Sequence, residues 1–165
     1  MQIRRIKSLT GDVDSLLQQS RDYQNELYPP ESVHQDDTSS LLSEHVYFVG
    51  AYQNGNQDDI QIRDEDQQLL GIGAVKFVEA IPAYGEIKNL FVPPEHRGKG
   101  AAKVIMSALE ARLQDQGAYL CRLETGPSQL ESIGLYHRLG YHQCALYGDY
   151  QPDPLSLFME KVLTD

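Results

Sequence analysis

The sequence predicts an α+β fold, in which a mixed, mostly antiparallel sheet of six to seven strands is flanked by about four helices. Two observations predict it. Strand-like segments separated by turns dominate the first half of the chain, whereas the second half alternates strand and helix before two final strands. A strand–helix–strand unit places its two strands parallel, and strands joined by hairpins run antiparallel. We therefore expect one parallel pair at the centre of the sheet, within a single domain over residues 1–165.

The first half of the chain supplies one long helix and most of the strands. Thr10 offers an N-terminal cap for this helix, and Pro29-Pro30 stops it. Residues 54–68 (NGNQDDIQIRDEDQQ) are polar and connect two strands as a long hairpin. In chain order we expect a strand over 3–6, a helix over 13–27, a short helix around 39–42, and strands over 45–52, 69–78 and 85–92.

The second half of the chain contains the most regular helix pattern of the sequence. Apolar residues recur there at spacings of three and four, which gives the helix one buried face. Gly117 closes this helix and Gly140 closes the next one, since glycine readily follows a helix end. The tetrapeptide SQLE (128–131) matches a capping box, so the second helix is expected to begin there. In chain order we expect a helix over 101–113, a strand over 119–124, a helix over 129–139, and strands over 141–146 and 155–162.

Charge and composition exclude several classes of protein. The net charge of −10 repels nucleic-acid phosphates, so we expect no nucleic-acid partner. No apolar run approaches the ~20 residues that a bilayer span needs, and the first residues, MQIRRIKSLTGD, do not form a secretory signal. We therefore expect no membrane partner and a cytoplasmic location. The two cysteines and five histidines show no metal-ligand spacing, so we expect no metal.

A basic, glycine-rich turn, RGKG (97–100), precedes the long helix and runs against the acidic balance of the chain. Its glycines expose the first backbone N–H groups of the helix, and the helix dipole favours an anion beside them. The turn is not a Walker phosphate loop, because Lys99 is followed by Gly100, and not a Rossmann fingerprint, because Lys103 occupies the third glycine position. The alternative interpretation is a flexible turn with incidental charges.

Four motifs follow one another between residues 84 and 141. They are GEIKNLFV (85–92), RGKGAA (97–102), LETG (123–126) and QLESIGLYHRLGY (129–141). Together they resemble the GNAT superfamily of acyl-CoA-dependent N-acetyltransferases, with its central strand, pyrophosphate loop, second parallel strand and following helix in that order. Gln129 and Ser132 depart from the family pattern, which has Asn and Ala there. The resemblance implies the three-layer GNAT fold, with its parallel pair splayed at the centre.

The resemblance implies acetyl-CoA as co-substrate and direct transfer in a ternary complex, with no metal. The turn before the long helix would hold the coenzyme's pyrophosphate on its backbone amides. The pantetheine arm would lie between the two parallel strands and bond the backbone of the first, much as an added strand does. The residues implied as coenzyme contacts are Leu90, Phe91, Val92, Arg97, Gly98, Lys99, Gly100, Ala101, Ala102 and Gln129.

Two residues match the catalytic positions of the family. An amine of pKa ~10.4 is almost wholly protonated at pH 7, and Glu86 matches the family position that accepts its proton. The alternative for Glu86 is a surface carboxylate that pairs with Lys88. Tyr136 matches the tyrosine that faces the leaving sulfur, where a phenol of pKa ~10 stabilises the thiolate by hydrogen bonding. The alternative for Tyr136 is a packed aromatic residue.

Acceptor pockets in this superfamily are built mainly from the first helices and the last hairpin. Here those segments are ELYPPESVH (26–34) and LYGDYQPDP (146–154), and Tyr84 precedes Glu86 on the same strand face. Their aromatic and acidic residues fit a small amine, a polyamine or an amino-acid-like acceptor, and equally a peptide N-terminus. The candidate acceptor contacts are Tyr28, Glu31, His34, Tyr84, Asp149 and Tyr150.

We therefore expect an N-acetyltransferase that moves an acetyl group from acetyl-CoA to a primary amine of a small-molecule or amino-acid-like acceptor. The alternative is a non-catalytic module of the same fold that binds acyl-CoA as a sensor or partner subunit. Glu86 and Tyr136 together favour catalysis, because a sensor needs neither residue. Members of the superfamily often form homodimers, so the resemblance implies a second copy of this chain as a further partner.

Overall fold

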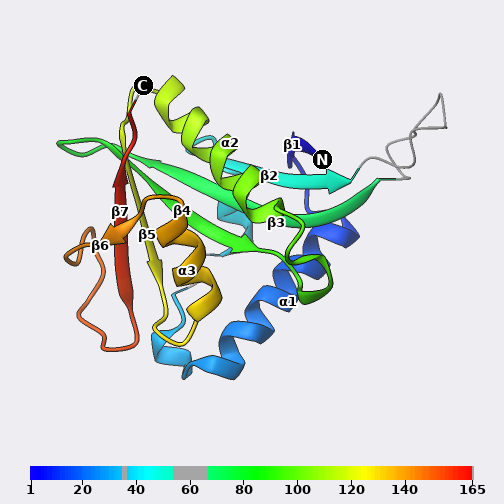
Figure 1. Ribbon diagram of the computed structural model, residues 1–165, viewed down its shortest axis with the longest axis horizontal. Helices are drawn as coiled ribbons and strands as arrows, with labels where there is room; N and C mark the ends of the chain where they lie inside the picture. Colours follow the sequence, from blue (N-terminus) through cyan, green and yellow to red (C-terminus); the bar gives the residue numbers. More distant parts are fainter. Residues whose placement is uncertain (35–36, 54–66, 165) are drawn as a thin grey trace.

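The computed structural model of the chain describes residues 1–34, 37–53 and 67–164. Its centre is a seven-stranded sheet in the order β1-β2-β3-β4-β5-β7-β6 (Figure 1), in which β4 and β5 are parallel and the other neighbouring strands are antiparallel. This confirms the predicted α+β class with one parallel pair. The strands are β1 (Gln2–Arg5), β2 (Val46–Gln53), β3 (Gln68–Val78), β4 (Tyr84–Phe91), β5 (Leu120–Thr125), β6 (His142–Gln143) and β7 (Leu157–Val162).

Three α-helices occur in the described part of the chain. They match the three longer helices that the sequence predicts, and the short helix expected around 39–42 is a 3-10 helix. None of the described helices is long and apolar enough to cross a bilayer. Of the hairpin expected over 54–68, residues 54–66 lie outside the described residues. The helices are α1 (Gly11–Leu27), α2 (Ala101–Asp115) and α3 (Leu130–Arg138), with 3-10 helices η1 (Pro30–Ser32), η2 (Thr38–Leu42) and η4 (Pro94–His96).

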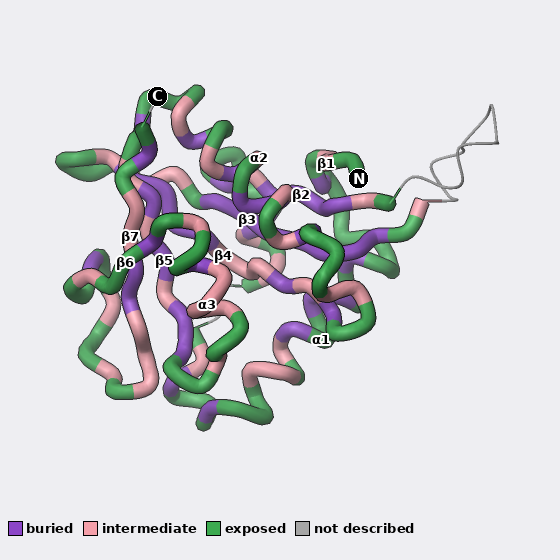
Figure 2. The backbone as a smooth tube through the Cα atoms, viewed as in Figure 1, coloured by how far each residue is buried: buried purple, intermediate pink, exposed green. Residues whose placement is uncertain are grey.

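The sheet carries a buried apolar layer on each face, because alternate strand residues point to opposite sides. On one face, Val13 and Leu17 of α1 pack in a cluster with Phe48 of β2. On the other face, Ile105 and Leu109 of α2 belong to a separate cluster that also includes residues of α3 and β5. Buried segments run along the central strands (Figure 2). The helices therefore cover the sheet on both sides, as in a three-layer fold.

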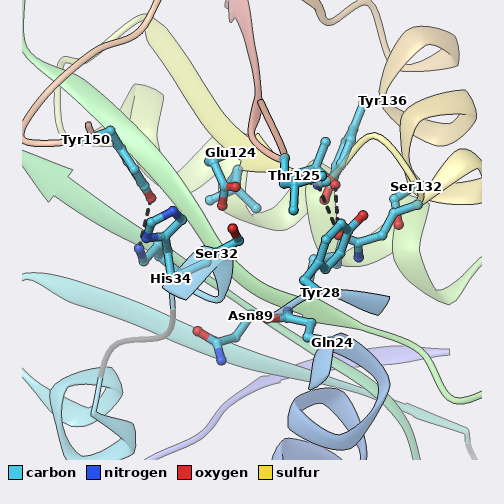
Figure 3. Close-up of a pocket in the computed structure, with 16 residues that line it drawn as sticks. Gln24, Tyr28, Ser32, His34, Asn89, Glu124, Thr125, Ser132, Tyr136 and Tyr150 are labelled. Atoms are coloured by element: carbon cyan, nitrogen blue, oxygen red, sulfur yellow. Dashed lines mark hydrogen bonds between the residues drawn. The ribbon is translucent and has the colours of Figure 1, made fainter. Parts of the chain in front are cut away.

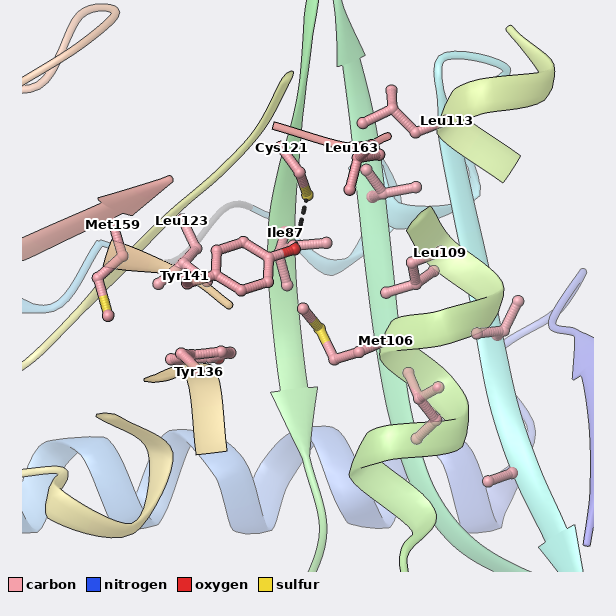
Figure 4. Close-up of a cluster of buried hydrophobic side chains, with 14 of the residues drawn as sticks. Ile87, Met106, Leu109, Leu113, Cys121, Leu123, Tyr136, Tyr141, Met159 and Leu163 are labelled. Carbon is pink, nitrogen blue, oxygen red and sulfur yellow. Dashed lines mark hydrogen bonds between the residues drawn. The ribbon is translucent and has the colours of Figure 1, made fainter. Parts of the chain in front are cut away.

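Two tyrosines occupy the cluster beneath α2 and α3 (Figure 4). The ring centroids of Tyr136 and Tyr141 are 5.9 Å apart. The Tyr141 hydroxyl donates to Glu110 Oε1 at 2.9 Å and lies 3.0 Å from Cys121 Sγ. Burial raises the pKa of the Cys121 thiol to about 12, so this sulfur remains a thiol at neutral pH. Cys121 is thus a packing residue.

The parallel pair separates toward its carboxyl ends. Pairing between β4 and β5 extends only as far as Ile87 with Leu123, after which the strands diverge (Figure 1). The register between β3 and β4 also shifts between Ile72 and Ala74, which places an extra residue in β4. Asn89, in this bulge, has a positive φ of 52°. A bulge bends its strand, and here it accompanies the opening of β4 away from β5.

The predicted capping box SQLE is wrong. The N-cap of α3 is Gln129, which makes no side-chain capping bond. Ser128 lies before the helix, and its N–H donates to Tyr28 Oη at 3.0 Å. The Glu131 carboxylate lies 2.8 Å from Nη1 of Arg97, in the turn before α2. A guanidinium is a stronger partner for a carboxylate than a neutral backbone amide, so Glu131 turns away from the start of its own helix.

The strand expected over 141–146 is shorter than predicted. Only His142–Gln143 pairs with β7, at the edge of the sheet. Further along, Tyr147 is buried, with its ring edge-on to the rings of Tyr84 and Phe158 at centroid distances of 5.6 and 5.5 Å. Packing of this aromatic side chain draws the segment inward, so it does not continue as a strand.

Candidate active site

A groove of about 630 Å³ lies between α1, the end of β4, the start of α2 and α3. All of the coenzyme contacts predicted from the sequence line this groove, except Lys99. Lys99 is exposed on the turn beside it. Tyr23, Lys103 and Arg138 also line the groove and were not among the predicted contacts. The structure therefore brings together the predicted contacts at the end of β4, at the start of α2 and before α3, and adds residues of α1 to them.

The turn before α2 leaves the first amides of the helix open to the groove. Gly98 and Gly100 have φ values of 76° and 84°, in the left-handed region that glycine adopts most easily. Gly100 is the N-cap of α2, and no side chain caps this helix end. A Cβ at either glycine would meet no atom within 4 Å, so the space in front of the turn is free. The helix start thus offers N–H donors to an anion in the groove.

Arg97 lies at the mouth of the groove and has partners on three sides. Its Nε donates to the Val92 carbonyl at 3.1 Å, and its Nη1 pairs with Glu131 Oε2 at 2.8 Å. The guanidinium also lies over the Tyr23 ring, 5.7 Å from its centroid. These contacts join the turn to α3 and α1 and hold the cation beside the groove.

A second, smaller cavity of about 80 Å³ lies where β4 and β5 separate (Figure 3). It shares part of its lining with the groove, so the two spaces adjoin. The residues common to both are Gln24, Leu90, Gln129 and Ser132. The other lining residues include the charged or aromatic side chains of His34, Lys88, Glu124, Tyr136 and Tyr150. Among the residues that the structure describes, no group of three or more His, Cys, Asp or Glu could hold a metal ion.

The predicted acceptor contacts divide into two groups. Those that line the cavity are Tyr28, His34 and Tyr150. Tyr84, Glu31 and Asp149 do not line it. Tyr84 instead packs behind the cavity in a cluster with Tyr147. Three of the six predicted side chains therefore border the cavity, and the other three lie elsewhere.

Glu86 is buried, with 8% of its surface exposed, and its Oε1 is surrounded by donors. The Tyr150 hydroxyl donates to this oxygen at 2.5 Å and the Tyr147 hydroxyl at 3.3 Å. The Lys88 ammonium lies 3.6 Å away from it. The pairing with Lys88 expected as the alternative for Glu86 thus exists, but inside the protein and not at its surface. Glu86 does not line the cavity itself and reaches it through Tyr150 and Lys88.

Glu124 and Tyr147 are two site residues that sequence reasoning missed. Glu124 stands near the carboxyl end of β5 and lines the cavity. Burial raises the pKa of its carboxyl, and the charge of Glu86 adds to this. A hydrogen bond from the Ser156 side chain and the charges of His34 and Lys88 act in the opposite direction. The sequence signal that could have identified Glu124 is the position of LETG at the end of a parallel strand, where ligands bind in many α/β proteins. For Tyr147, the only such signal is its place in the last hairpin.

Tyr136 lines the cavity from α3 and is 6% exposed. Burial raises the pKa of its phenol, so the hydroxyl keeps its proton at physiological pH. No described residue forms a hydrogen bond with this hydroxyl. Nearby, Gln129 Oε1 accepts from the Gly126 N–H at 3.1 Å, which orients the side-chain amide between groove and cavity.

Comparisons with known proteins agree with this architecture. The sequence model of the Acetyltransferase (GNAT) family matches residues 13–141. An "IAA acetyltransferase" of Azospirillum brasilense is 33% identical over 161 residues, which cover 98% of this chain and 97% of that protein. The crystal structure of a putative acyl-CoA N-acyltransferase from Klebsiella pneumoniae subsp. pneumoniae MGH 78578 has a TM-score of 0.77 at 31% identity, covering 99% and 97% of the two chains.

The fold is also found in a protein solved with a coenzyme. The PaiA N-acetyltransferase of Thermoplasma acidophilum, in complex with coenzyme A, has a TM-score of 0.62 at 18% identity and covers 98% of this chain and 99% of its own. The class defined by the splayed parallel pair and the glycine-led helix is therefore that of the acyl-CoA N-acyltransferases. Within that class, the chain belongs to the acetyltransferase (GNAT) family.

Proposed function

We propose that this protein transfers an acetyl group from acetyl-CoA to a primary amine of a small-molecule or amino-acid-like acceptor, by direct attack in a ternary complex. One observation carries the proposal: the groove at the start of α2 and the polar cavity between β4 and β5 share a wall. A coenzyme in the groove would reach the cavity with its thioester, where an amine in the cavity could attack it. Binding of coenzyme A by a protein of the same fold supports this arrangement.

The coenzyme would be held mainly by backbone groups. Its pyrophosphate would accept hydrogen bonds from the amides at the start of α2, with the charges of Arg97 and Lys99 nearby. Its pantetheine arm would follow residues 90–92 beyond the point where β4 leaves β5, and bond the backbone there. The Gln129 amide, which lines both spaces, would contact the same arm.

The chemistry requires a neutral amine and a stabilised leaving group. The amine nitrogen attacks the thioester carbonyl, an N–C bond forms, and the C–S bond breaks with its electrons on sulfur. Tyr136, protonated and in the cavity wall, would donate a hydrogen bond to the developing thiolate. A carboxylate would take the ammonium proton, and the two candidates are Glu86, buried at the family position, and Glu124, half-buried in the cavity wall.

The acceptor would be small and polar. The cavity of about 80 Å³ leaves little room beyond the reacting amine and its neighbouring groups. Tyr28, His34 and Tyr150 would contact it. A cytoplasmic location, where acetyl-CoA is available, fits this activity.

Two measurements test the proposal. Calorimetry should show binding of acetyl-CoA and no binding of NAD or ATP. An assay that follows thiol release with a panel of small primary amines should then identify acceptors. Binding of acetyl-CoA without thiol release from any amine would favour the alternative, a non-catalytic acyl-CoA sensor, and would reject transfer.

A further inference from the structure

We propose that Glu124 is the catalytic residue that binds the ammonium group of the acceptor and takes its proton, and that Glu86 is a positioning residue. This inference rests on the proposed acetyl transfer and names the residue that carries its first proton transfer. Glu86 would act through Tyr150 and Lys88, which it holds in the cavity wall.

The position of Glu124 places a carboxylate in the wall of the cavity. The last residue of β5 that pairs with β4 is Leu123, so Glu124 is the first to face the opening between the strands. It lines the cavity together with Tyr136, whose pKa the charge of Glu124 helps to raise. The proposed base and the proposed thiolate-stabilising hydroxyl therefore border one small space (Figure 3). An amine between them would lie next to both reacting partners.

Glu86 lacks this access. It does not line the cavity, and its Oε1 already faces two phenols and an ammonium. An acceptor proton arriving at this oxygen would have to displace one of those donors. Burial raises the pKa of Tyr147, so this phenol keeps its proton and remains a donor to Glu86. The carboxylate thus organises Tyr147, Tyr150 and Lys88 from behind the cavity.

The charges around Glu124 favour a cationic acceptor. Two charged or titratable neighbours of Glu124 already pair with other residues of the protein. Lys88 lies 3.6 Å from Glu86, and His34 lies 3.9 Å from Asp153. No ion pair to Glu124 occurs among the described residues. The Ser156 hydroxyl is a hydrogen-bond partner of this half-buried carboxylate, and an arriving ammonium would add an ionic partner. The titratable or charged groups that face it are His34 from the segment after η1, Glu86 and Lys88 from β4, Tyr136 from α3, and Tyr147 and Tyr150 from the segment before β7.

The proton balance of the step is simple. The Glu124 carboxylate takes one proton from the ammonium ion, which leaves a neutral amine and a carboxylic acid. The amine attacks the thioester and the C–S bond breaks, giving an N-protonated amide and a thiolate. The N-protonated amide then loses its extra proton, and the thiolate gains one proton and becomes a thiol. Glu124 releases the proton that it took from the ammonium ion to solvent. The products are an acetamide, coenzyme A thiol and one proton.

The test compares the pH dependence of kcat/KM for the amine in three proteins: wild type, Glu124→Gln and Glu86→Gln. Both substitutions keep the side-chain shape and remove one carboxylate. At pH 7 we expect Glu124→Gln to lose about a hundredfold in kcat, and to regain activity as pH approaches the pKa of the amine, because neutral amine is then supplied by solution. Glu86→Gln should lose less than tenfold, mainly through the acceptor KM, and keep the wild-type profile.

Two outcomes would overturn the assignment in different ways. If Glu86→Gln shows the large loss and the altered profile while Glu124→Gln keeps the wild-type profile, Glu86 is the base and Glu124 is not. If wild type binds acetyl-CoA but releases thiol with no amine, the proposed function itself fails, and this inference fails with it. Calorimetry with acetyl-CoA should give the same Kd for all three proteins, which separates a lost proton acceptor from a damaged fold.

A measurement independent of turnover tests the burial of the carboxylate. A raised pKa means that the folded protein binds the Glu124 proton more tightly than the unfolded chain does, so this group lowers stability as pH rises through its folded pKa. Glu124→Gln should therefore have a higher Tm than wild type at pH 8, and the difference should shrink toward pH 4. An unchanged or lower Tm at pH 8 would contradict a carboxylate whose charged form is disfavoured in the folded protein.

Discussion

The groove and the cavity adjoin, yet they are built in different ways. The groove includes two short stretches of contiguous chain, residues 90–92 at the end of β4 and the turn and helix start before and within α2, which α1 and α3 flank. The cavity is formed by side chains from segments far apart in the sequence, including His34, Lys88 and Glu124. The first region presents amide donors in an open space, and the second is lined by a carboxylate, an ammonium and phenols.

This difference predicts how each region responds to substitution. Anion binding by backbone amides depends on chain conformation, so it is sensitive to a glycine with positive φ and tolerant of side-chain changes. Chemistry in the cavity depends on single oxygen atoms, so removal of one hydroxyl or carboxylate should change turnover and leave coenzyme affinity intact. Each variant below alters either the groove or the cavity. The property that depends on the unaltered region, coenzyme affinity or turnover, is measured for comparison.

Of the four variants that follow, Tyr136→Phe is expected to have the largest effect. Loss of the hydroxyl proposed to face the leaving sulfur should reduce kcat more than tenfold, while the Kd for acetyl-CoA stays unchanged, because the groove is untouched. Steady-state kinetics and calorimetry measure the two quantities. Tyr141→Phe is the matched control: its ring is 5.9 Å from that of Tyr136, but its hydroxyl bonds Glu110 in the core. It should cost about 1 kcal/mol of stability and no turnover. Full turnover in Tyr136→Phe would reject its role.

Gly100→Ala should weaken acetyl-CoA binding about tenfold. A residue with a Cβ pays roughly 1–2 kcal/mol in the left-handed conformation, so the turn should relax and lose its amide alignment. Gly117→Ala is the control, because Gly117 has a φ of 77°, has equally free space around an added Cβ, and lies beyond the other end of α2. It should lower Tm by a similar amount without changing the Kd. Equal affinity losses in both variants would show that general destabilisation, and not the turn, is responsible.

Tyr150→Phe should raise the acceptor KM about fivefold, with the acetyl-CoA KM unchanged. The variant removes the 2.5 Å hydrogen bond to Glu86 and a contact of Lys88 with the same hydroxyl, for which about 1 kcal/mol is a typical cost. Initial rates with each substrate varied in turn separate the two KM values. A change confined to the acetyl-CoA KM would mean that Tyr150 belongs to the groove and that the division into two regions is wrong.

The smallest effect is expected for Glu131→Gln. The Arg97–Glu131 pair is solvent-exposed, so its loss should hardly change Tm. Freed from this carboxylate, Arg97 should bind the coenzyme phosphates about twofold more tightly at low salt, and the gain should vanish at high salt. Glu95→Gln, an exposed change of equal charge in η4, is the control. Weaker binding by Glu131→Gln would indicate that the pair supports the turn.

Local sequence predicted the parts of the molecule that depend on neighbouring residues. The helix over 101–113, its glycine entry and its stop at Gly117 all match the structure, since capping and periodicity act within a few residues. The family motifs likewise predicted the splayed parallel pair, and all of the predicted coenzyme contacts except Lys99 line the groove. Where a distant group competes, local rules failed: Glu131 pairs with Arg97 and leaves the expected capping box unformed.

By itself, the sequence determined the family, the order of the strands and helices, and the glycine turn that leaves the start of α2 uncapped. Contiguous backbone conformation follows from contiguous residues, so these features could be predicted from motifs. Only the tertiary structure decided which carboxylate lines the cavity. Residues 34, 88, 124 and 150 meet because three layers pack around a sheet whose parallel pair separates after Ile87, and the depth at which each side chain is buried depends on all of those contacts together. Glu124 enters the cavity and Glu86 lies behind it for that reason.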